Sequence, residues 1–574
     1  MLELRYLVKV ERYLFVYSRR LNQKIAVEDN NENKGILKYF SIFMGSLSLL
    51  ALISILLIQF FLTFDPSNPT IFTKNNPLLI LLVFFIFTGI QFVLYKLINL
   101  LKIPTRKLHQ YLLGFTLLIG VLVTVVFASP PYSDAWSVIN GFSIDNWLTV
   151  PYTNYYPNNM GLALLYQLIF KILGRQSWTI MYGVNIASVI GIFHVLPRLT
   201  LILGNEKSER ICIQLLFFAL PFSFMTTYLY NDLISLFLAL QSIYFLIEFM
   251  KSDKIKNGKI ILSGILLGLS YIFKTNSIIF AIGIFIYIVL YIIKNRKITY
   301  KSFLSFLPII IMVFMKVVFQ FSIPFLVTDY RKEEAQPAIS WIAMAIADEH
   351  SMKGYQFKKP GMFNDFESWT FAEYKKDNKN STKHDFIKDK DSRKNIYSNF
   401  IKDRILDMGK HPKEAFKFYA QKEVASWGDA SFGSEKFLKE SYENQKDIYN
   451  SLPFENIAKI QGIQSTSAKQ YINSTEKFQS SAAIKSIENK FFLKIIERPF
   501  IILIFMGAMI YIGKKFKTFS LEDLLLLTIF MGGFIFHEFI WETQPRYLLA
   551  YFTLLIPFSA IGINQLLSMK KKTS

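Results

Sequence analysis

The sequence predicts an all-α polytopic membrane protein, and its composition and hydropathy are the observations that predict it. Of its 574 residues, 52% are hydrophobic and 16% are aromatic. Several apolar runs reach about 18 residues or more, the length at which a helix crosses the hydrocarbon core of a bilayer. Backbone polar groups cannot stay unpaired in lipid, so each run is interpreted as a helix.

About twelve spans are expected. They fall at roughly 37–64, 78–101, 110–128, 177–203, 211–229, 232–250, 259–274, 276–293, 302–328, 492–513, 520–540 and 547–567. A shorter apolar segment, 161–173, is interpreted as an interfacial or re-entrant helix. If it spanned the membrane, the charged loop 206–210 would lie on the outer side, against the distribution of positive charge that membrane proteins follow.

The net charge of +22 is explained by basic loops between the spans. Placing these loops in the cytoplasm leaves 129–160 and 329–491 outside and both termini inside. A basic excess at the cytoplasmic surface of a membrane reflects anionic headgroups, and no nucleic-acid-binding motif is present, so we expect membrane lipids as partners and no nucleic acid. The basic segments are the N-terminal tail, 102–107, 251–259, 294–301, 514–517 and 570–572.

The expected organisation is a helical bundle with an extracellular, mostly helical domain inserted between late spans. Within the insert, Phe400 to Met408 and Pro412 to Val424 have helical patterning, whereas the highly charged stretch Lys375 to Lys394 is predicted to be a solvated loop. The predicted parts are a cytoplasmic tail (1–36), two accessory transmembrane helices (37–109), a catalytic transmembrane module (110–328), the extracellular domain (329–491), the C-terminal transmembrane helices (492–567) and a cytoplasmic tail (568–574).

Several chemistries are excluded or disfavoured. A single cysteine, Cys212, excludes an intrachain disulfide and a cysteine-based metal cluster. No P-loop is present, which argues against an ATP-driven pump. The spacing of Asp389 and Asp391 resembles a metal-binding D-x-D motif, but it lies in a charge run that we interpret as solvated. We expect no cofactor and assign no metal ligands, and whether a divalent metal ion assists the reaction is left open.

The segment Ser129 to Gly161 is the strongest candidate for a site. It follows an apolar run, contains seven aromatic residues and no Lys or Arg, and carries Asp134 and Asp145. Asp134 is expected at headgroup depth, where a carboxylate can act as a general base. A turn or helix-capping role after Pro130 is the competing interpretation. For Asp145, a simple surface position is favoured.

Later junctions on the same predicted side carry charges that need an explanation. Asp232 opens a span, where it is either functional or a helix N-cap. Lys274 and Arg546 lie where positive charge is disfavoured, and clamping a phosphate leaving group would explain them. Snorkelling, or pairing of Arg546 with Glu542, is the alternative. Asp134 and Asp232 are therefore candidate catalytic residues, and the candidate substrate-binding residues are Asp145, Trp136, Tyr156, Asn158, Lys274, Arg546 and Glu542.

Four short motifs carry a resemblance to a known superfamily. They are S-D-A-W at Asp134, Y-Y-P-N-N-M-G-L at 155–162, Y-N-D at Asp232 and W-E-x-x-x-R-Y-L-L at 541–549. In this order they resemble the GT-C fold glycosyltransferases, which include protein O-mannosyltransferases and the aminoarabinose transferase of lipid A. The multispanning envelope glycosyltransferases of Gram-positive bacteria look most similar. The resemblance covers about 110–328 and 492–567 and implies that Asp134 is the base. Ala135 stands where the mannosyltransferases often have a second acid.

The predicted function follows from the side of the membrane. Nucleotide sugars and ATP are not available outside a cell, so sugar transfer there needs a lipid-delivered donor. We expect a polyprenyl-phosphate-linked sugar as donor and an envelope glycan, teichoic acid or glycolipid as acceptor. The alternatives are a polysaccharide polymerase or ligase that uses lipid-linked glycans, and a flippase for a lipid-linked sugar.

Overall fold

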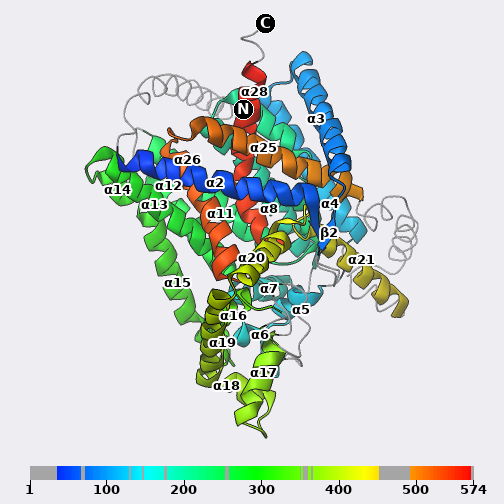
Figure 1. Cartoon of the computed structure of the whole chain (residues 1–574), viewed down its shortest axis with the longest axis vertical. Helices are drawn as coiled ribbons and strands as arrows, with labels where there is room; N and C mark the ends of the chain where they lie inside the picture. Colours follow the sequence, from blue (N-terminus) through cyan, green and yellow to red (C-terminus); the bar gives the residue numbers. More distant parts are fainter. Residues whose placement is uncertain are drawn as a thin grey trace.

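The computed structural model shows the predicted all-α architecture of a multi-pass membrane protein (Figure 1). The predicted tails lie largely outside the described residues, as do Asp145 and the last part of the insert. The structure describes residues 35–65, 72–127, 129, 131–144, 148–173, 178–252, 257–348, 351–352, 360–362, 366–451 and 491–569.

Within these ranges, nine helical segments are long and apolar enough to cross a membrane. Some of them include a short helical extension: η3 (Thr275–Ser277), α14 (Tyr300–Leu304), η5 (Leu493–Glu497) and η6 (Phe536–Ile540). The main helices are α2 (Ile36–Phe61), α3 (Pro77–Leu100), α4 (Thr105–Phe127), α8 (Trp178–Leu203), α11 (Asp232–Lys251), α13 (Ile278–Asn295), α15 (Leu307–Leu326), α25 (Arg498–Lys515) and α26 (Leu521–Ile535).

The other three predicted spans are helical but are not straight, full-length helices. Two are broken pairs, α9 (Glu206–Leu216) with α10 (Leu220–Phe224) and η2 (Met225–Thr227), bent by 51°, and α27 (Pro545–Phe552) with α28 (Leu555–Met569), bent by 50°. Pro221 lacks an amide hydrogen and stands at the start of α10, which accounts for the first break. The third, α12 (Asn257–Phe273), is shorter than the spans around it.

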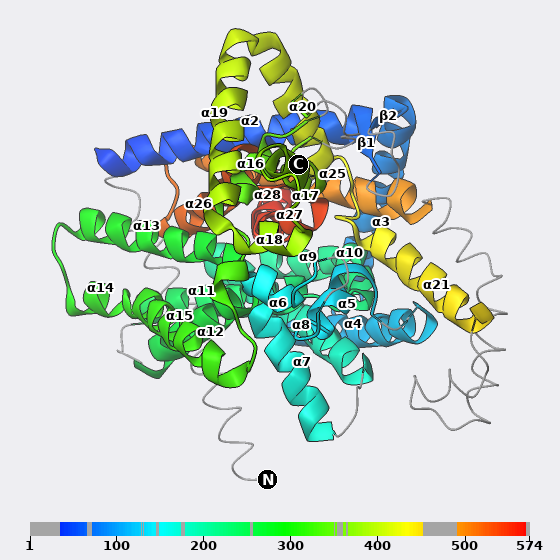
Figure 2. The ribbon, with the colours of Figure 1, turned by 90° about the horizontal axis from the view of Figure 1, so that it is seen from below.

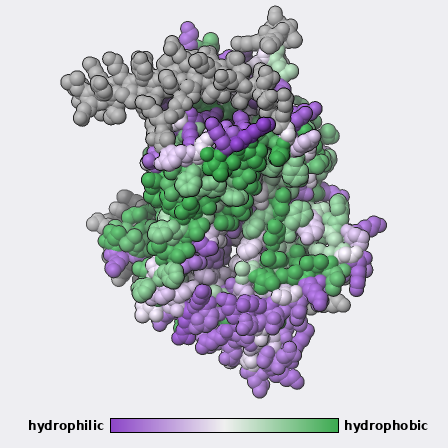
Figure 3. All heavy atoms as spheres, turned by 90° about the vertical axis from the view of Figure 1, so that its left-hand side faces the viewer, coloured by the Kyte–Doolittle hydropathy of each residue, from purple (hydrophilic) through white to green (hydrophobic). Residues whose placement is uncertain are grey.

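Polar structure gathers at one face of the bundle. There α5 (Ser133–Ile139), α6 (Tyr152–Tyr155), η1 (Pro157–Asn159) and α7 (Met160–Leu173) lie close to the inserted helices (Figures 1 and 2). The space-filling view shows a hydrophobic band with the hydrophilic insert below it (Figure 3). We call this end of the molecule the polar face. A small antiparallel ribbon, β1 (Leu62–Phe64) with β2 (Phe72–Lys74), follows α2.

The insert is helical, and one prediction about it was wrong. It contains η4 (Lys332–Glu334), α16 (Ile339–Ala345), α17 (Phe366–Asp377), α18 (Lys383–Lys388), α19 (Lys390–Lys410), α20 (Pro412–Trp427) and α21 (Ser434–Ser451). The stretch 375–394 was expected to be a solvated loop but is mostly helix. Thr382 and Asp385 form a capping box at the start of α18, and Phe386 and Ile387 are buried, so local caps and two apolar contacts outweigh the charge. Asp389 of the D-x-D sequence is the N-cap of α19.

The insert is attached to the bundle through buried polar contacts. Lys422 of α20 is fully buried, and its Nζ donates to the carbonyl oxygens of Ala345 (2.9 Å) and Trp541 (3.0 Å). The backbone N–H of Gln336 donates to the carbonyl of Tyr155 (2.9 Å). These contacts hold the insert, the segment before α7 and the end of η6 in fixed positions relative to each other.

The last spans approach each other closely. A Cβ added at Gly562 of α28 would overlap the carbonyl oxygen of Gly507 of α25, so the two helices cross with almost no side chain between them. Small residues at such a crossing let the backbones pack in van der Waals contact, which drives helix association in membranes.

We therefore expect Gly562→Ala to lower the free energy of unfolding by about 2 to 3 kcal/mol, because the helices must separate to accept a methyl group. Thermal or denaturant unfolding of the detergent-solubilised chain measures this. Gly513→Ala is the matched control. Gly513 lies on α25, like Gly507, but a Cβ at Gly513 meets nothing within 4 Å. Equal stability of the two variants would contradict the packing argument.

Candidate functional site

Two charged residues far apart in the sequence meet at the polar face. Asp134 lies in the first turn of α5, and Arg546 lies in the first turn of α27. Arg546 Nη2 is 3.0 Å from Asp134 Oδ2, although the residues are 412 positions apart. The Asp134 side chain is 45% exposed and that of Arg546 only 9%, so a held cation faces an accessible carboxylate.

Aromatic rings fix the guanidinium of Arg546. Its Nη1 donates to the hydroxyl of Tyr228 (2.8 Å), and its central carbon lies 4.9 Å from the ring centroid of Tyr230 and 5.4 Å from that of Tyr228. Phe437 of the insert stacks on Tyr228 at 3.8 Å, with the rings 10° from parallel. Burial raises the pKa of Tyr228 well above its ordinary value, so this hydroxyl stays protonated. The arginine is held in one orientation by neutral, rigid neighbours.

A second ion pair lies beside the first. Lys274, at the junction of α12 and η3, pairs with Asp232 at the start of α11. Both side chains are largely buried, and Lys274 Nζ lies 4.9 Å from the ring centroid of Tyr547. Asp232 Oδ2 and Arg546 Nε are buried and have no hydrogen-bond partner among the described residues. Unpaired buried polar atoms are costly, and these two lie on residues that line a pocket, where they can hydrogen-bond to a polar ligand.

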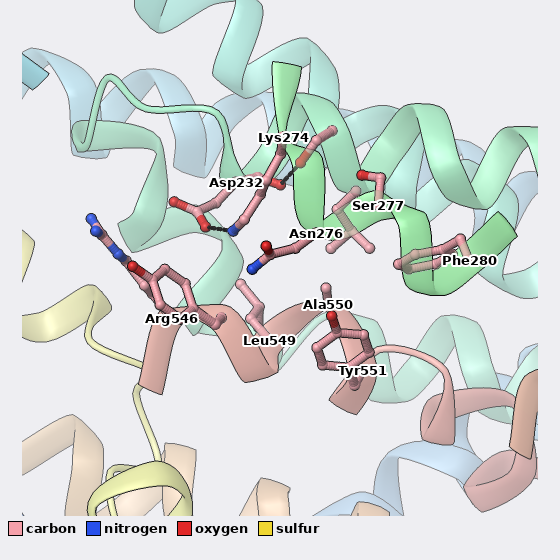
Figure 4. A pocket seen from close by; sticks show the side chains of 12 residues that line it. Asp232, Lys274, Asn276, Ser277, Phe280, Arg546, Leu549, Ala550 and Tyr551 are labelled. Atoms are coloured by element: carbon pink, nitrogen blue, oxygen red, sulfur yellow. Dashed lines mark hydrogen bonds and ion pairs between the residues drawn. The ribbon is translucent and has the colours of Figure 1, made fainter. Parts of the chain in front are cut away.

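A small pocket connects these groups. Figure 4 shows the Asp232–Lys274 pair and Arg546 at the same end of this pocket, with Phe280 and Tyr551 at the other end. Two cations and an apolar end suit a ligand that has an anionic group and an apolar or ring-shaped part. The pocket is lined by Asp232, Ser235, Leu236, Lys274, Asn276, Ser277, Phe280, Arg546, Tyr547, Leu549, Ala550 and Tyr551.

Asn159 connects the segment before α7 to this pocket, and the sequence analysis did not select it. Its Oδ1 accepts hydrogen bonds from the hydroxyl of Tyr230 (3.1 Å) and from Nδ2 of Asn231 (3.3 Å). Asn231 also donates to the carbonyl of Phe273 (2.8 Å), next to Lys274. Asn159 is buried, whereas the neighbouring Asn158, which was selected, is half-buried. The Y-P-N-N motif indicated the right turn, but the sequence does not say which asparagine points inward.

The other predicted residues lie around this centre with different contacts. Trp136 is on α5 and 50% exposed. Tyr156 is buried, and its ring lies 6.0 Å from that of Trp341 in the insert. Glu542 is buried and accepts a hydrogen bond from Gln544 (3.2 Å). The ion-pair partner of Arg546 is Asp134 rather than Glu542, and Asp145 lies outside the described residues.

The helix-capping role that the sequence offered as an alternative for Asp134 and Asp232 is not observed. α5 has no side-chain capping hydrogen bond at Tyr132, its N-cap, and α11 has none at Asn231. In the part of the chain that the structure describes, no group of three or more His, Cys, Asp or Glu residues is arranged to hold a metal ion. The site therefore consists of two acid–base pairs, several tyrosines and two buried asparagines.

Part of the chain that builds this site matches a known protein family. Residues 159–319 match the family model described as dolichyl-phosphate-mannose-protein mannosyltransferase. The predicted GT-C fold is confirmed. The matched segment contains Asn159, Asp232 and Lys274, whereas Asp134 and Arg546 lie outside it. No curated protein matches the sequence.

Two solved structures from Archaeoglobus fulgidus are similar at 11% sequence identity. One is the archaeal oligosaccharyltransferase AglB in complex with an inhibitory peptide and a dolichol-phosphate, with a TM-score of 0.39. The other is an oligosaccharyltransferase tethered with an acceptor peptide containing the NVT sequon via a disulfide bond, with a TM-score of 0.41. Each alignment covers 80% of this chain and 50% of the other, so this chain spans about half the length of those proteins.

We expect Asn159→Ala to lower the free energy of unfolding by about 1 to 3 kcal/mol, because it removes the acceptor of the Tyr230 hydroxyl and one of the two acceptors of the Asn231 amide. Asn158→Ala, one position away, should change it by less than about 0.5 kcal/mol. Thermal unfolding of both variants in the same detergent is the measurement. A larger loss of stability in Asn158→Ala than in Asn159→Ala would contradict the assignment of Asn159 as the centre of the buried network.

Proposed function

We propose that this protein is an integral membrane glycosyltransferase that moves a sugar from a polyprenyl phosphate to an acceptor hydroxyl outside the cell. The observation that carries the proposal is the contact between Asp134 and Arg546 beside the Asp232–Lys274 pair. Two held cations that line one pocket, with an accessible acid in contact with one of them, are the groups that such a transfer requires. The GT-C fold is consistent with this chemistry.

The reaction assigns each group a role. A bond forms between the acceptor oxygen and the anomeric carbon of the sugar while the bond from that carbon to the phosphate oxygen breaks. Asp134 takes the proton of the acceptor hydroxyl. The electron pair of the broken bond stays on the departing polyprenyl phosphate, and Arg546 and Lys274 stabilise its negative charge. Asp232 orients Lys274 and is available to a sugar hydroxyl through Oδ2.

The Asp134–Arg546 ion pair gives this scheme an order of events. Arg546 Nη2 occupies one oxygen of Asp134, Oδ2, at 3.0 Å. An incoming donor phosphate is a second anion that competes for Arg546, and when it binds the guanidinium it frees Asp134. Asp134 Oδ2 thus becomes available to the acceptor hydroxyl when the donor is in place, which favours transfer over unproductive reactions in an empty site.

The insert is the proposed acceptor-binding part. Phe437 stacks directly on Tyr228, and Trp341 lies beside Tyr156, so two inserted helices border the site. We propose an envelope glycan, teichoic acid or glycolipid as acceptor. In this proposal residues 110–328 and 492–567 form the catalytic module, both termini are cytoplasmic and the polar face is extracellular.

We expect Asp134→Asn to reduce transfer from a radiolabelled polyprenyl-phosphate sugar by about 10²- to 10⁴-fold, the usual contribution of a general base. Asp391→Asn is the matched control, because Asp391 makes only an exposed pair with Lys394 on α19, and it should retain full activity. The assay uses purified full-length protein and a mixture of envelope acceptors. Retained transfer in Asp134→Asn would remove this residue as the base, and movement of the lipid across the membrane without transfer would favour a flippase.

We expect Lys274→Gln to lower kcat/KM by roughly 10- to 100-fold, because one charge-assisted contact with the leaving phosphate is lost. Lys259→Gln on the opposite end of α12 makes the same change away from the pocket and should be neutral. Steady-state kinetics with varied donor concentration measure the effect. A Lys274→Gln enzyme with unchanged kcat/KM would show that this lysine does not contact the donor.

A further inference from the structure

One half-buried lysine lies midway along an apolar helix, at the edge of a face that no other part of the described structure covers. Lys316 belongs to α15, and only 22% of the most apolar window of that span is buried. The neighbouring residues Val313, Phe314, Val317 and Val318 are exposed. In a membrane this face meets lipid, where an uncompensated positive charge is costly.

Nearby polar groups supply hydrogen-bond donors but no negative charge. Lys316 Nζ lies 5.5 Å from the ring centroid of Tyr271 on α12. Gln320 is exposed one turn further along α15, and residues four apart share a helix face. No carboxylate of the described residues pairs with Lys316, in contrast to Lys274, which is neutralised by Asp232. Because the described residues supply no carboxylate to Lys316, an anion at the lipid surface can compensate its charge.

The position of this group along the bundle agrees with a lipid phosphate. Tyr271 precedes Lys274 by about one turn of α12, so the group is close in level to the reaction pocket. The start of α7 packs against the same end of α12, since a Cβ at Gly161 would overlap the backbone of Ile272. A lysine stem can extend along an apolar surface and place its ammonium group toward the headgroups.

We propose that Lys316, Gln320 and Tyr271 form a binding site for a lipid phosphate on the membrane-facing surface between α12 and α15. An ammonium group, an amide and a phenol hydroxyl offer donors to the phosphate oxygens, while the acyl or polyprenyl chain lies along the apolar surface of α15. The ligand is a polyprenyl monophosphate or a membrane phospholipid, which share this phosphate chemistry. The site is separate from the reaction pocket and does not depend on the proposed transfer.

Native mass spectrometry of the full-length protein tests the proposal with three added lipids: a polyprenyl monophosphate, phosphatidylglycerol and uncharged polyprenol. Lys316→Gln removes the charge, and Lys316→Arg keeps it. Lys96→Gln is the matched control, because Lys96 is also a lysine on an apolar helix, α3, with its Nζ 5.3 Å from the ring centroid of Phe92 on that same helix. A glutamine on a lipid-facing surface leaves the packed interior intact, and thermal unfolding verifies this.

We expect Lys316→Gln to weaken binding of at least one of the two phosphate lipids about tenfold, with polyprenol binding unchanged. Lys316→Arg and Lys96→Gln should bind like the wild type. A loss confined to polyprenyl phosphate identifies a substrate or product site, and a loss confined to phosphatidylglycerol identifies a structural lipid. Wild-type binding of both phosphate lipids by Lys316→Gln, or an equal loss in Lys96→Gln, would overturn the proposal. If the wild-type protein transferred no sugar, the proposed function would be wrong, but the lipid-binding result would still hold.

Discussion

A charge inside a membrane-spanning bundle is stable only where an opposite charge or a set of hydrogen bonds compensates it, and this constraint organises the polar face. The Asp134–Arg546 and Asp232–Lys274 pairs meet it with acids and bases from four separate segments. A buried charge without its partner would destabilise the folded state. The pairs therefore hold α5, α11, the α12–η3 junction and α27 together. Asp232, whose Oδ2 has no hydrogen-bond partner among the described residues, lines the pocket between these segments.

The insert is part of this arrangement rather than a separate appendage. Buried Lys422 fixes α20 to the backbone at Trp541, just before α27, while Phe437 stacks on the tyrosine that holds Arg546. Both contacts act on the segment that carries Arg546. The insert and the helix that carries Arg546 are therefore positioned together, which is the physical link through which the proposed acceptor binding would act on the Asp134–Arg546 pair.

In the proposed lipid-phosphate site, the membrane surrounds the protein and also supplies the ligand. The reaction pocket and the proposed lipid-phosphate site meet at the end of α12, where Tyr271 lies in the last turn and Lys274 follows directly after the helix. The two lysines differ in their compensation: Lys274 pairs with the carboxylate of Asp232, whereas none of the described carboxylates pairs with Lys316. A carboxylate partner keeps a cation in place when the pocket is empty, and an unpaired cation on the lipid face favours a lipid anion.

Hydropathy alone predicted which runs are helical, because a membrane imposes complete backbone pairing on every apolar run. It did not predict that, of the twelve expected spans, two are bent pairs and α12 is short. It also indicated Asp134, Asp232, Lys274 and Arg546, since charges at membrane boundaries are rare enough to need a reason. The sequence could not predict that α18 and α19 form in the charged insert, where caps and two buried side chains decide. It could not choose between Asn158 and Asn159 either. Only the tertiary structure pairs Asp134 with Arg546 across 412 residues, because no periodicity in the chain records which distant helices pack together.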